Sequence, residues 1–340
     1  MSRCLGDRVE LITRASDLER LRPEWDCLYE RCPHATPFQQ PSWLIGWWHS
    51  FAPGTLQVIC VRRAGTLVGC APFYLETTAA GVLRILPLGI GVSDYLDVLI
   101  APDAFTNVDR LLGDHIAARR DEFDSWELCE LRPQSAAMNL SVPAGMMEHR
   151  VECSTCPVLK MPRGAPDLRH VLPGHRMQAL RTGWRRARAF GNIHIEQATI
   201  DTARELLTVL DELHRKRWRT ENEPGVTADR RVHELLVRSV PEWIGMGRCM
   251  LLVMFCDRVA VAAHLLLRGR EELLSYMTGY DPEYRQLGVG GLLLGDAIER
   301  ARAGGEDFHF LRGEEGYKYL WGARPRSNWR RLFTPVGGPQ

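Results

Sequence analysis

The stretch from Glu271 to Ala303 constrains the fold of this chain more than any other segment. It reads as a strand, then a glycine-rich loop that opens directly into an amphipathic helix. Arg285, Gly288 and Gly290 stand in this loop at the spacing R-x-x-G-x-G. Such a loop turns successive backbone N–H groups into one concavity, and the helix adds the positive end of its dipole. The pattern predicts a pyrophosphate site, with a tight strand-to-helix turn as the structural alternative.

Two other phosphate-binding patterns are absent from this loop. The dinucleotide pattern G-x-G-x-x-G does not occur there, and no G-K-[ST] follows as in a Walker loop. The net charge of +1 provides no global field for nucleic acid or a membrane surface. No apolar run approaches the ~20 residues that span a bilayer. The sequence therefore favours a small-molecule partner over nucleic acid, and it leaves the oligomeric state open.

Cysteine usage indicates the compartment. The ten cysteines show no framework spacing, and no signal peptide precedes them, so we expect a reducing cytoplasm. Cys153 and Cys156 form a single C-x-x-C. A zinc site would need two more ligands, and none stands at a suitable spacing, so no metal site is expected.

The 340 residues predict two domains, 1–160 and 161–340. A Pro-, Gly- and Cys-rich stretch over 132–175 is interpreted as an irregular crossover between them. The first domain is expected to be a compact α/β unit that includes a strand over 95–100. The second is expected to run as strand 193–197, helices 202–219 and 229–246, strands 249–256, 258–267 and 271–280, helix 289–303, strand 308–311, short helix 314–321 and strand 329–333.

A basic helix is predicted over 175–190, and it contains no acidic residue. Its face is either simply solvated or a surface for an anionic partner, such as a phosphorylated cofactor tail or RNA. The arginines of this helix are Arg176, Arg181, Arg185, Arg186 and Arg188.

The element order of the second half resembles that of the GCN5-related N-acetyltransferases, or GNATs. Their pyrophosphate loop has the signature [Q/R]-x-x-G-x-[G/A], which the loop from Arg285 to Gly290 matches. Segments 279–284 (GYDPEY) and 308–321 (FHFLRGEEGYKYLW) are similar to the CelD-type acetyltransferases, a group related to the FemAB peptidyltransferases. Segment 93–97 (SDYLD) in the first half also resembles that group. The resemblance covers nearly the whole chain and is more specific in the second half.

The resemblance implies an α/β (α+β) fold of two tandem GNAT-like domains, each with a mixed, mostly antiparallel sheet flanked by helices. It implies an acyl-CoA-dependent N- or O-acyltransferase, with acetyl-CoA or another acyl-CoA as donor. The acceptor would be a sugar, lipid precursor or small amine of cell-envelope or polysaccharide metabolism. One alternative is a FemAB-like aminoacyl-tRNA-dependent transferase that uses the basic helix on RNA. Another is a non-catalytic accessory protein of polysaccharide biosynthesis.

The site residues are expected to fall into three groups. Tyr317 would protonate the leaving thiolate, with Tyr319 as a competing candidate, and the base stays open among Asp281, Glu314, Glu315 and His264. Residues expected to bind acyl-CoA are Met277, Gly279, Arg285, Gln286, Leu287, Gly288, Val289, Gly290 and Gly291. Residues expected to bind the acceptor are Asp94, Tyr95, Asp97, His264, Arg312, Lys318 and Trp321.

Structural alternatives apply to several of these residues. His264 stands in an apolar run, where a satisfied core histidine is the other interpretation. Arg312 and Glu315 would otherwise form a structural ion pair. The acids of segment 93–97 would otherwise be exposed loop residues, and Trp321 would simply pack.

Overall fold

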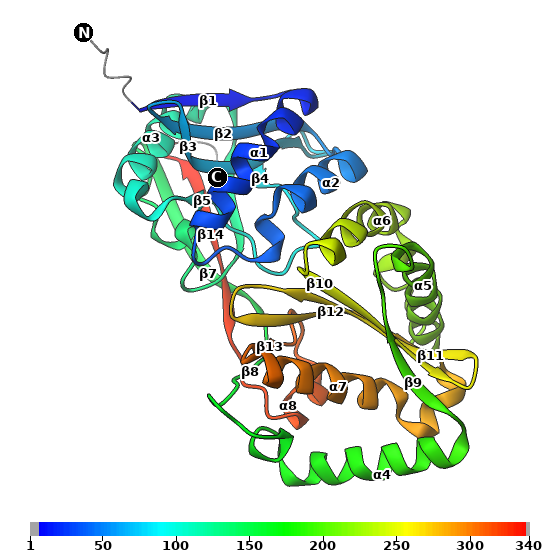
Figure 1. Ribbon diagram of the computed structural model, residues 1–340. Coiled ribbons are helices and arrows are strands. Elements are labelled where there is room, and N and C mark those ends of the chain that lie inside the picture. Colours follow the sequence, from blue (N-terminus) through cyan, green and yellow to red (C-terminus); the bar gives the residue numbers. More distant parts are fainter. Residues whose placement is uncertain (1–6, 338–340) are drawn as a thin grey trace. The chain divides into compact units, whose positions relative to one another are not determined.

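The computed structural model describes residues 7–337, which divide into two compact units. The first unit takes in the chain up to Ser154 and again from Ser327, and the second is Thr155–Arg326 (Figure 1). Each unit contains a mostly antiparallel sheet flanked by helices, which confirms the predicted mixed α/β fold. The sequence predicts one division at 160/161, whereas the last strand of the chain belongs to the sheet of the first unit.

The sheet of the first unit has the order β1-β2-β3-β4-β6-β14-β7, and β5 pairs with β3. Strands β4 and β6 pair in parallel, whereas β1 with β2, β2 with β3, β3 with β4, β3 with β5 and β6 with β14 pair antiparallel. Its strands are β1 (Arg8–Ile12), β2 (Thr55–Arg63), β3 (Thr66–Thr77), β4 (Leu83–Pro87), β5 (Leu99–Ile100), β6 (Ser125–Leu131), β7 (Met146–Thr155) and β14 (Ser327–Pro335). Its helices are α1 (Ala15–Arg31), α2 (Pro41–Phe51) and α3 (Phe105–Ala118).

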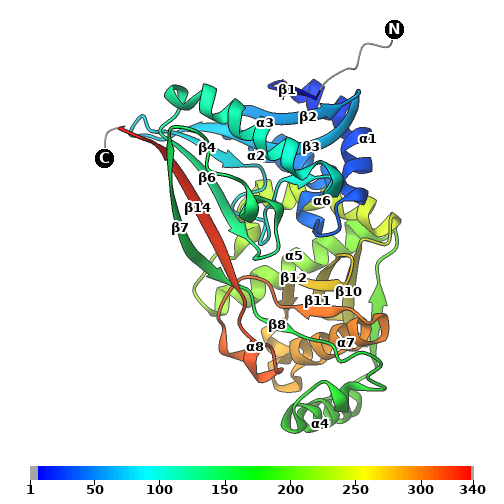
Figure 2. The ribbon, with the colours of Figure 1, turned by 90° about the vertical axis from the view of Figure 1, so that its left-hand side faces the viewer.

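Strand β14 joins this sheet because its side chains complete the core there. Phe333 stacks on Trp126 of β6 with ring centroids 4.7 Å apart. Arg331 is 1% exposed and donates to Glu148 of β7 at 2.7 Å and to the carbonyl of Ala137 at 2.6 Å. Figure 2 shows β14 running between β6 and β7. The contacts are long-range, so the periodicity of 329–333 predicts a strand without predicting its partner.

The sheet of the second unit has the order β8-β13-β12-β11-β10-β9, and only β12 and β13 pair in parallel. Its strands are β8 (Val158–Leu159), β9 (Ile193–Gln197), β10 (Cys249–Cys256), β11 (Val259–Arg268), β12 (Glu272–Tyr280) and β13 (Asp307–His309). Its helices are α4 (Gly174–Phe190), α5 (Ala203–Thr220), α6 (Arg230–Gly245), α7 (Val289–Gly304) and α8 (Gly316–Leu320), and the 3₁₀-helix η7 (Pro282–Leu287) precedes α7.

Helices cover both faces of this sheet, with α5 and α6 on one face and α7 on the other (Figures 1 and 2). Helix α5 buries Leu206, Leu210 and Leu213, the spacing of an apolar helix face. It packs so closely on β12 that a Cβ on Gly279 would lie 2.4 Å from the backbone nitrogen of His214. Gly279 therefore has a packing role, because only a residue without a side chain allows this approach.

Two segments differ from the sequence predictions. Only Leu99–Ile100 of the strand expected over 95–100 pairs in the sheet, because the backbone before it bends and its polar groups bond to other segments. The stretch 132–175, expected to be irregular, contains the ten-residue strand β7 and the short strand β8. No described helix is long and apolar enough to cross a membrane.

Candidate active site

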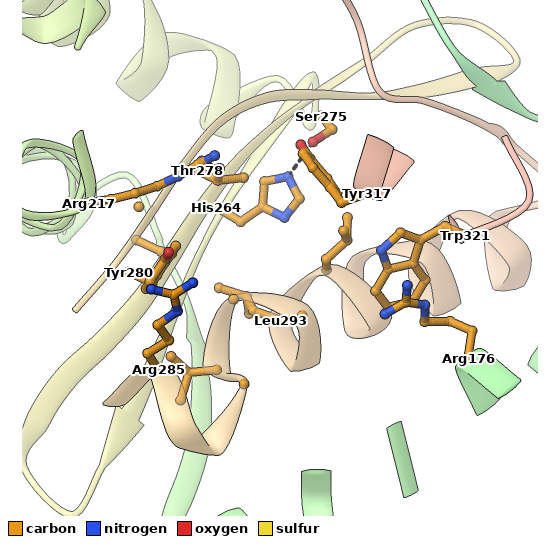
Figure 3. Close-up of a pocket in the computed structure, with 17 residues that line it drawn as sticks. Arg176, Arg217, His264, Ser275, Thr278, Tyr280, Arg285, Leu293, Tyr317 and Trp321 are labelled. Atoms are coloured by element: carbon orange, nitrogen blue, oxygen red, sulfur yellow. Dashed lines mark hydrogen bonds between the residues drawn. The ribbon is translucent and has the colours of Figure 1, made fainter. Parts of the chain in front are cut away.

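A pocket of about 340 Å³ opens in the second unit where β12 and β13 diverge (Figure 3). The two strands pair only over Glu272–Leu274 and Asp307–His309, after which β12 continues to Tyr280 paired with β11 only. Past Leu274, the edge of β12 that faces away from β11 has no strand partner. The pocket is lined by Arg176, Arg217, Ala263, His264, Ser275, Thr278, Gly279, Tyr280, Arg285, Gly288, Val289, Gly290, Gly291, Leu293, Leu294, Tyr317 and Trp321.

The glycine-rich loop forms one end of this pocket. Gly288 adopts φ 69°, a left-handed conformation that favours glycine, and begins α7. The first bond of α7 runs from the nitrogen of Leu292 to the carbonyl of Gly288 at 3.0 Å. The N–H groups of the three residues before Leu292, Val289 to Gly291, make no hydrogen bond to other backbone groups of the described chain. All three residues line the pocket, so these amides and the helix dipole can bind an anion there.

Two predicted loop residues lie outside the pocket lining. Leu287 is buried in the core of the second unit. The carbonyl of Gln286 accepts a hydrogen bond from Nη1 of Arg186 at 2.8 Å, which attaches helix α4 to the loop. Leu287 therefore anchors the loop in the core, and the backbone of the exposed Gln286 ties the loop to α4.

Three arginines from three elements line the pocket, and none has a carboxylate partner in the part of the chain that the structure describes. Arg285 comes from η7, just before α7, and its side chain points toward Tyr280 (Figure 3). Arg217 donates to Oγ1 of Thr278 at 2.9 Å. The guanidinium of Arg176 lies 4.8 Å from the centre of the Trp321 ring, and its Nε is buried without a hydrogen-bond partner. Burial lowers the pKa of Arg176, so an anionic ligand would relieve an electrostatic cost.

His264 of β11 is 1% exposed and lines the pocket, with Nε2 2.8 Å from Oγ of Ser275 on β12. Its Nδ1 is buried and has no hydrogen-bond partner. Burial lowers the pKa of His264 to about 3, so the ring is neutral at physiological pH. The interpretation as a fully satisfied core histidine is therefore wrong, because one ring nitrogen is left for another group.

Tyr317 of α8 also lines the pocket and keeps 39% of its surface exposed. Burial of the phenol raises its pKa to about 12, with the nearby Glu315 carboxylate adding to the shift. The hydroxyl therefore stays protonated at physiological pH and can donate a proton. The competing candidate Tyr319 is not among the lining residues.

Lys318 lies behind Tyr317 and outside the pocket lining. Its Nζ donates to the carbonyls of Leu311, Arg312 and Gly313 at 3.2, 2.8 and 3.1 Å, and lies 2.9 Å from Glu315. An ammonium has three donors, so these contacts leave none for an acceptor molecule. Lys318 therefore fixes the segment that leads into α8 and positions Tyr317.

Asp281, Glu315, Arg312 and Met277 are likewise absent from the pocket lining. Asp281 lies 2.6 Å from Nζ of Lys216 and caps η7 by accepting from the nitrogen of Glu283 at 3.1 Å. It supports the start of the loop by these contacts.

The three candidates of the first unit are held by contacts within that unit. The carboxylate of Asp97 accepts from the nitrogens of Val98, Ala136 and Ala137 at 2.8 to 2.9 Å. Tyr95 is buried, with the guanidinium carbon of Arg132 5.0 Å from its ring centre. The carbonyl of Asp94 accepts from Nδ2 of Asn328 at 2.8 Å. The structure therefore gives Asp97 and Tyr95 structural contacts.

The sequence gives no signal for three polar lining residues, Arg217, Ser275 and Thr278. They come from α5 and β12, and only the tertiary packing brings them to the loop. Arg176 is an exception, because the acid-free basic helix identifies it as an unpaired cation.

Comparisons with known proteins agree with this geometry. Residues 174–319 match the family model described as the acetyltransferase (GNAT) domain. No curated protein matches the chain in sequence. The match begins at the start of α4 and ends within α8, so it contains every lining residue of the pocket except Trp321.

Solved structures share the fold of both units at low sequence identity. FemX is 10% identical with a TM-score of 0.65, covering 95% of this chain and 96% of its own. L-PGS from Bacillus licheniformis is 12% identical with a TM-score of 0.57, covering 98% and 95%. The C-terminal domain of a putative lysylphosphatidylglycerol synthetase from Agrobacterium fabrum is 11% identical with a TM-score of 0.57, covering 94% and 91%. Such identities show the fold alone, and the similarity to the acetyltransferase (GNAT) domain covers residues 174–319.

Proposed function

We propose that the second unit is an acyl-CoA-dependent N- or O-acyltransferase of the CelD-like type, with acetyl-CoA as the simplest donor. The observation that carries the proposal is that the N–H groups of Val289 to Gly291 have no backbone partner in the described chain and line the same pocket as Arg285, which has no acidic partner there. Two linked phosphoryl groups supply the negative charge that this end of the pocket lacks. Gly288, Val289, Gly290 and Gly291 would bind the diphosphate together with Arg285.

The rest of the donor fits the geometry of the diverging strands. The pantetheine arm carries amides, and the unpartnered edge of β12 past Leu274 can pair with them as an added strand would. The donor supplies a thioester, whose acyl group an amine or hydroxyl acceptor can take. The remaining chemistry falls to side chains of the pocket.

Tyr317 is the proposed general acid. Its phenol is protonated, lines the pocket, and is held in place by the contacts of Lys318 with the preceding loop. A donor at this position would protonate the leaving thiolate. For the base, the open Nδ1 of the neutral His264 favours it over Asp281 and Glu315, which are held by Lys216 and Lys318.

The acceptor class is the least constrained part of the proposal. A sugar, a lipid precursor or a small amine of cell-envelope or polysaccharide metabolism fits an open pocket with polar and aromatic lining. Arg176 and Arg217 have no acidic partner among the described residues, which favours an acceptor that carries an anionic group.

A second candidate is a FemAB-like aminoacyl-tRNA-dependent transferase, and helix α4 favours it. The helix carries no acid, and Arg181, Arg185 and Arg188 are exposed and have no acidic partner among the described residues. Such a ridge would suit an RNA backbone. The intact CoA loop favours the first candidate. Loss of chemistry, as in an accessory protein, is a third outcome.

Thermal unfolding with added ligands tests the proposal. Acetyl-CoA at 100 times its dissociation constant should stabilise the protein by about 2.7 kcal/mol. Free-thiol release is then measured with a panel of amines and hydroxyls. Stabilisation by acetyl-CoA with indifference to tRNA supports the proposal. Strongly salt-dependent tRNA binding without a response to acetyl-CoA would replace it with the second candidate, and no response to either would favour the accessory protein.

A further inference from the structure

Ser275 and His264 form a hydroxyl–imidazole pair inside the pocket, and the proposed direct transfer uses only the imidazole of this pair. Oγ of Ser275 lies 2.8 Å from Nε2 of His264, and both residues line the cavity. A hydroxyl in contact with an imidazole is the arrangement by which a weak nucleophile is activated. The ring is neutral, so a tautomer with its proton on Nδ1 leaves Nε2 able to accept the hydroxyl proton.

The position of Ser275 on its strand places the pair near the acyl group. Ser275 is the first residue of β12 after the last pairing with β13 at Leu274. The register of β11 and β12 also shifts between Leu265 and Leu266, which pair with Met277 and Ser275. At Ser275, where the pocket begins, β12 therefore loses its pairing with β13 and shifts its register with β11. A donor arm lying along the unpartnered edge of β12 would pass this hydroxyl.

The buried, unpartnered Nδ1 of His264 is the second observation that points to chemistry. An orphaned nitrogen in a packed interior costs free energy, and proteins tolerate such groups at functional sites. Within the described residues, no carboxylate is bonded to this ring. Positive charge on the imidazole would therefore be stabilised by a negative charge that forms at the same moment, as on a tetrahedral oxyanion.

We propose that Ser275 is an acyl acceptor in the reaction and forms a covalent acyl-serine intermediate, with His264 as its base. This inference rests on the proposed acyl-CoA-dependent function. Oγ of Ser275 attacks the thioester carbonyl, the C–S bond breaks, and a C–O ester bond forms. The serine proton moves to Nε2 of His264, Tyr317 protonates the leaving thiolate, and the imidazolium returns a proton to the phenolate.

The second half of the cycle restores the protein. An amine or hydroxyl acceptor attacks the acyl-serine carbonyl, and its proton passes to Nε2 of His264. The C–O ester bond breaks and Ser275 regains a proton from the imidazolium. The sum is transfer of one acyl group from thioester to acceptor, with no oxidant or other co-reactant.

The test is a half-reaction without an acceptor. The protein is mixed with acetyl-CoA, quenched in acid, and analysed by intact mass, peptide mapping and free-thiol release. We expect release of about one thiol per protein molecule and an acetyl group mapped to residue 275. Ser275→Ala should bind acetyl-CoA with unchanged affinity and form no adduct, whereas Ser275→Cys should form a thioester adduct. Ser141→Ala, an exposed serine of the first unit, should behave as wild type.

The outcomes separate this inference from the proposed function. Acetyl-CoA binding and turnover without an adduct, with Ser275→Ala retaining wild-type turnover, would overturn the acyl-serine and leave the acyltransferase intact. Absence of acetyl-CoA binding would overturn both. An acetyl group mapped to another residue would also contradict the role of Ser275.

Discussion

The first and the second unit each contain a set of polar groups, and the two sets differ in how many of their partners the fold supplies. In the first, Arg331 donates to a carboxylate and two carbonyls, and Asp97 accepts from three backbone nitrogens. In the second, Arg285 and Arg176 have no acidic partner in the described chain, and Nδ1 of His264 has no partner. A satisfied polar group stabilises the fold that surrounds it. A set of unsatisfied groups around a cavity indicates a ligand that would complete them.

The largest expected effect concerns the satisfied arginine. Arg331→Met should destabilise the first unit by about 3–5 kcal/mol, because the carbonyls of Ala137 and Leu140 would lose their buried donor and Glu148 would keep only the more exposed Arg150 as an ion-pair partner. Arg285→Met in the second unit should change stability by less than about 0.5 kcal/mol, since nothing in the fold pairs with it. Urea unfolding of both variants measures this difference. Equal losses would contradict the contrast between the units.

The next effect concerns the proposed acid. Tyr317→Phe should lower kcat by about 100-fold or more and leave acetyl-CoA affinity unchanged, because the hydroxyl acts on the leaving group. Tyr319→Phe, two residues away and outside the pocket lining, is the matched control and should retain full turnover. Thiol release under saturating donor gives both values. Unchanged turnover in Tyr317→Phe would remove this residue from the acid role.

A smaller effect is opposite pH dependence of stability from the two units. The pKa of His264 is about 3 in the fold, below its ordinary 6.5. The contribution of His264 to the free energy of unfolding therefore falls as the pH drops from about 6.5 to about 3. The pKa of Asp97 is raised by burial to about 6, above its ordinary 3.8. The contribution of Asp97 to the free energy of unfolding therefore falls as the pH rises from about 4 to about 6. Each slope is at most about 1.4 kcal/mol per pH unit.

Single substitutions separate the contributions of His264 and Asp97 to the pH dependence of stability. His264→Gln should remove the loss of stability on the acid side, and Asp97→Asn should remove the loss toward neutral pH. The measurement is the free energy of unfolding in urea at several pH values, compared as slopes and not as absolute stabilities. A His264→Gln profile parallel to wild type would show that the imidazole is not held neutral.

Local signals predicted the parts of the fold that depend on local chemistry. The loop from Arg285 to Gly291 could be recognised because its glycine spacing and the helix that follows lie in one continuous stretch of sequence. Helices such as α4 and α5 follow from apolar periodicity in the same way. The divergence of β12 from β13 was harder to predict, because apolar and polar residues alternate in the same way in a diverging strand and in a paired one. Only the family resemblance pointed to that divergence.

Partners that come from distant segments could not be predicted. The burial of β14 in the first unit depends on Trp126 and Glu148, which lie about two hundred residues earlier in the chain. Lys318 and Glu315 belong to a charged cluster. From sequence alone, this cluster could bind the acceptor or could form structural ion pairs. The structure resolves this for Lys318, because its donors are taken by carbonyls five to seven residues earlier in the chain.

Acetyl-CoA binding to matched arginine variants tests the central claim most directly. Calorimetric titration should show saturable binding to the wild type, and at least tenfold weaker binding to Arg285→Met, the loss of about 1.4 kcal/mol expected for a charged hydrogen bond. Arg181→Met, on the exposed face of α4, should bind as wild type. Equal affinity of wild type and Arg285→Met, or no binding to any of the three, would contradict a diphosphate site at the start of α7.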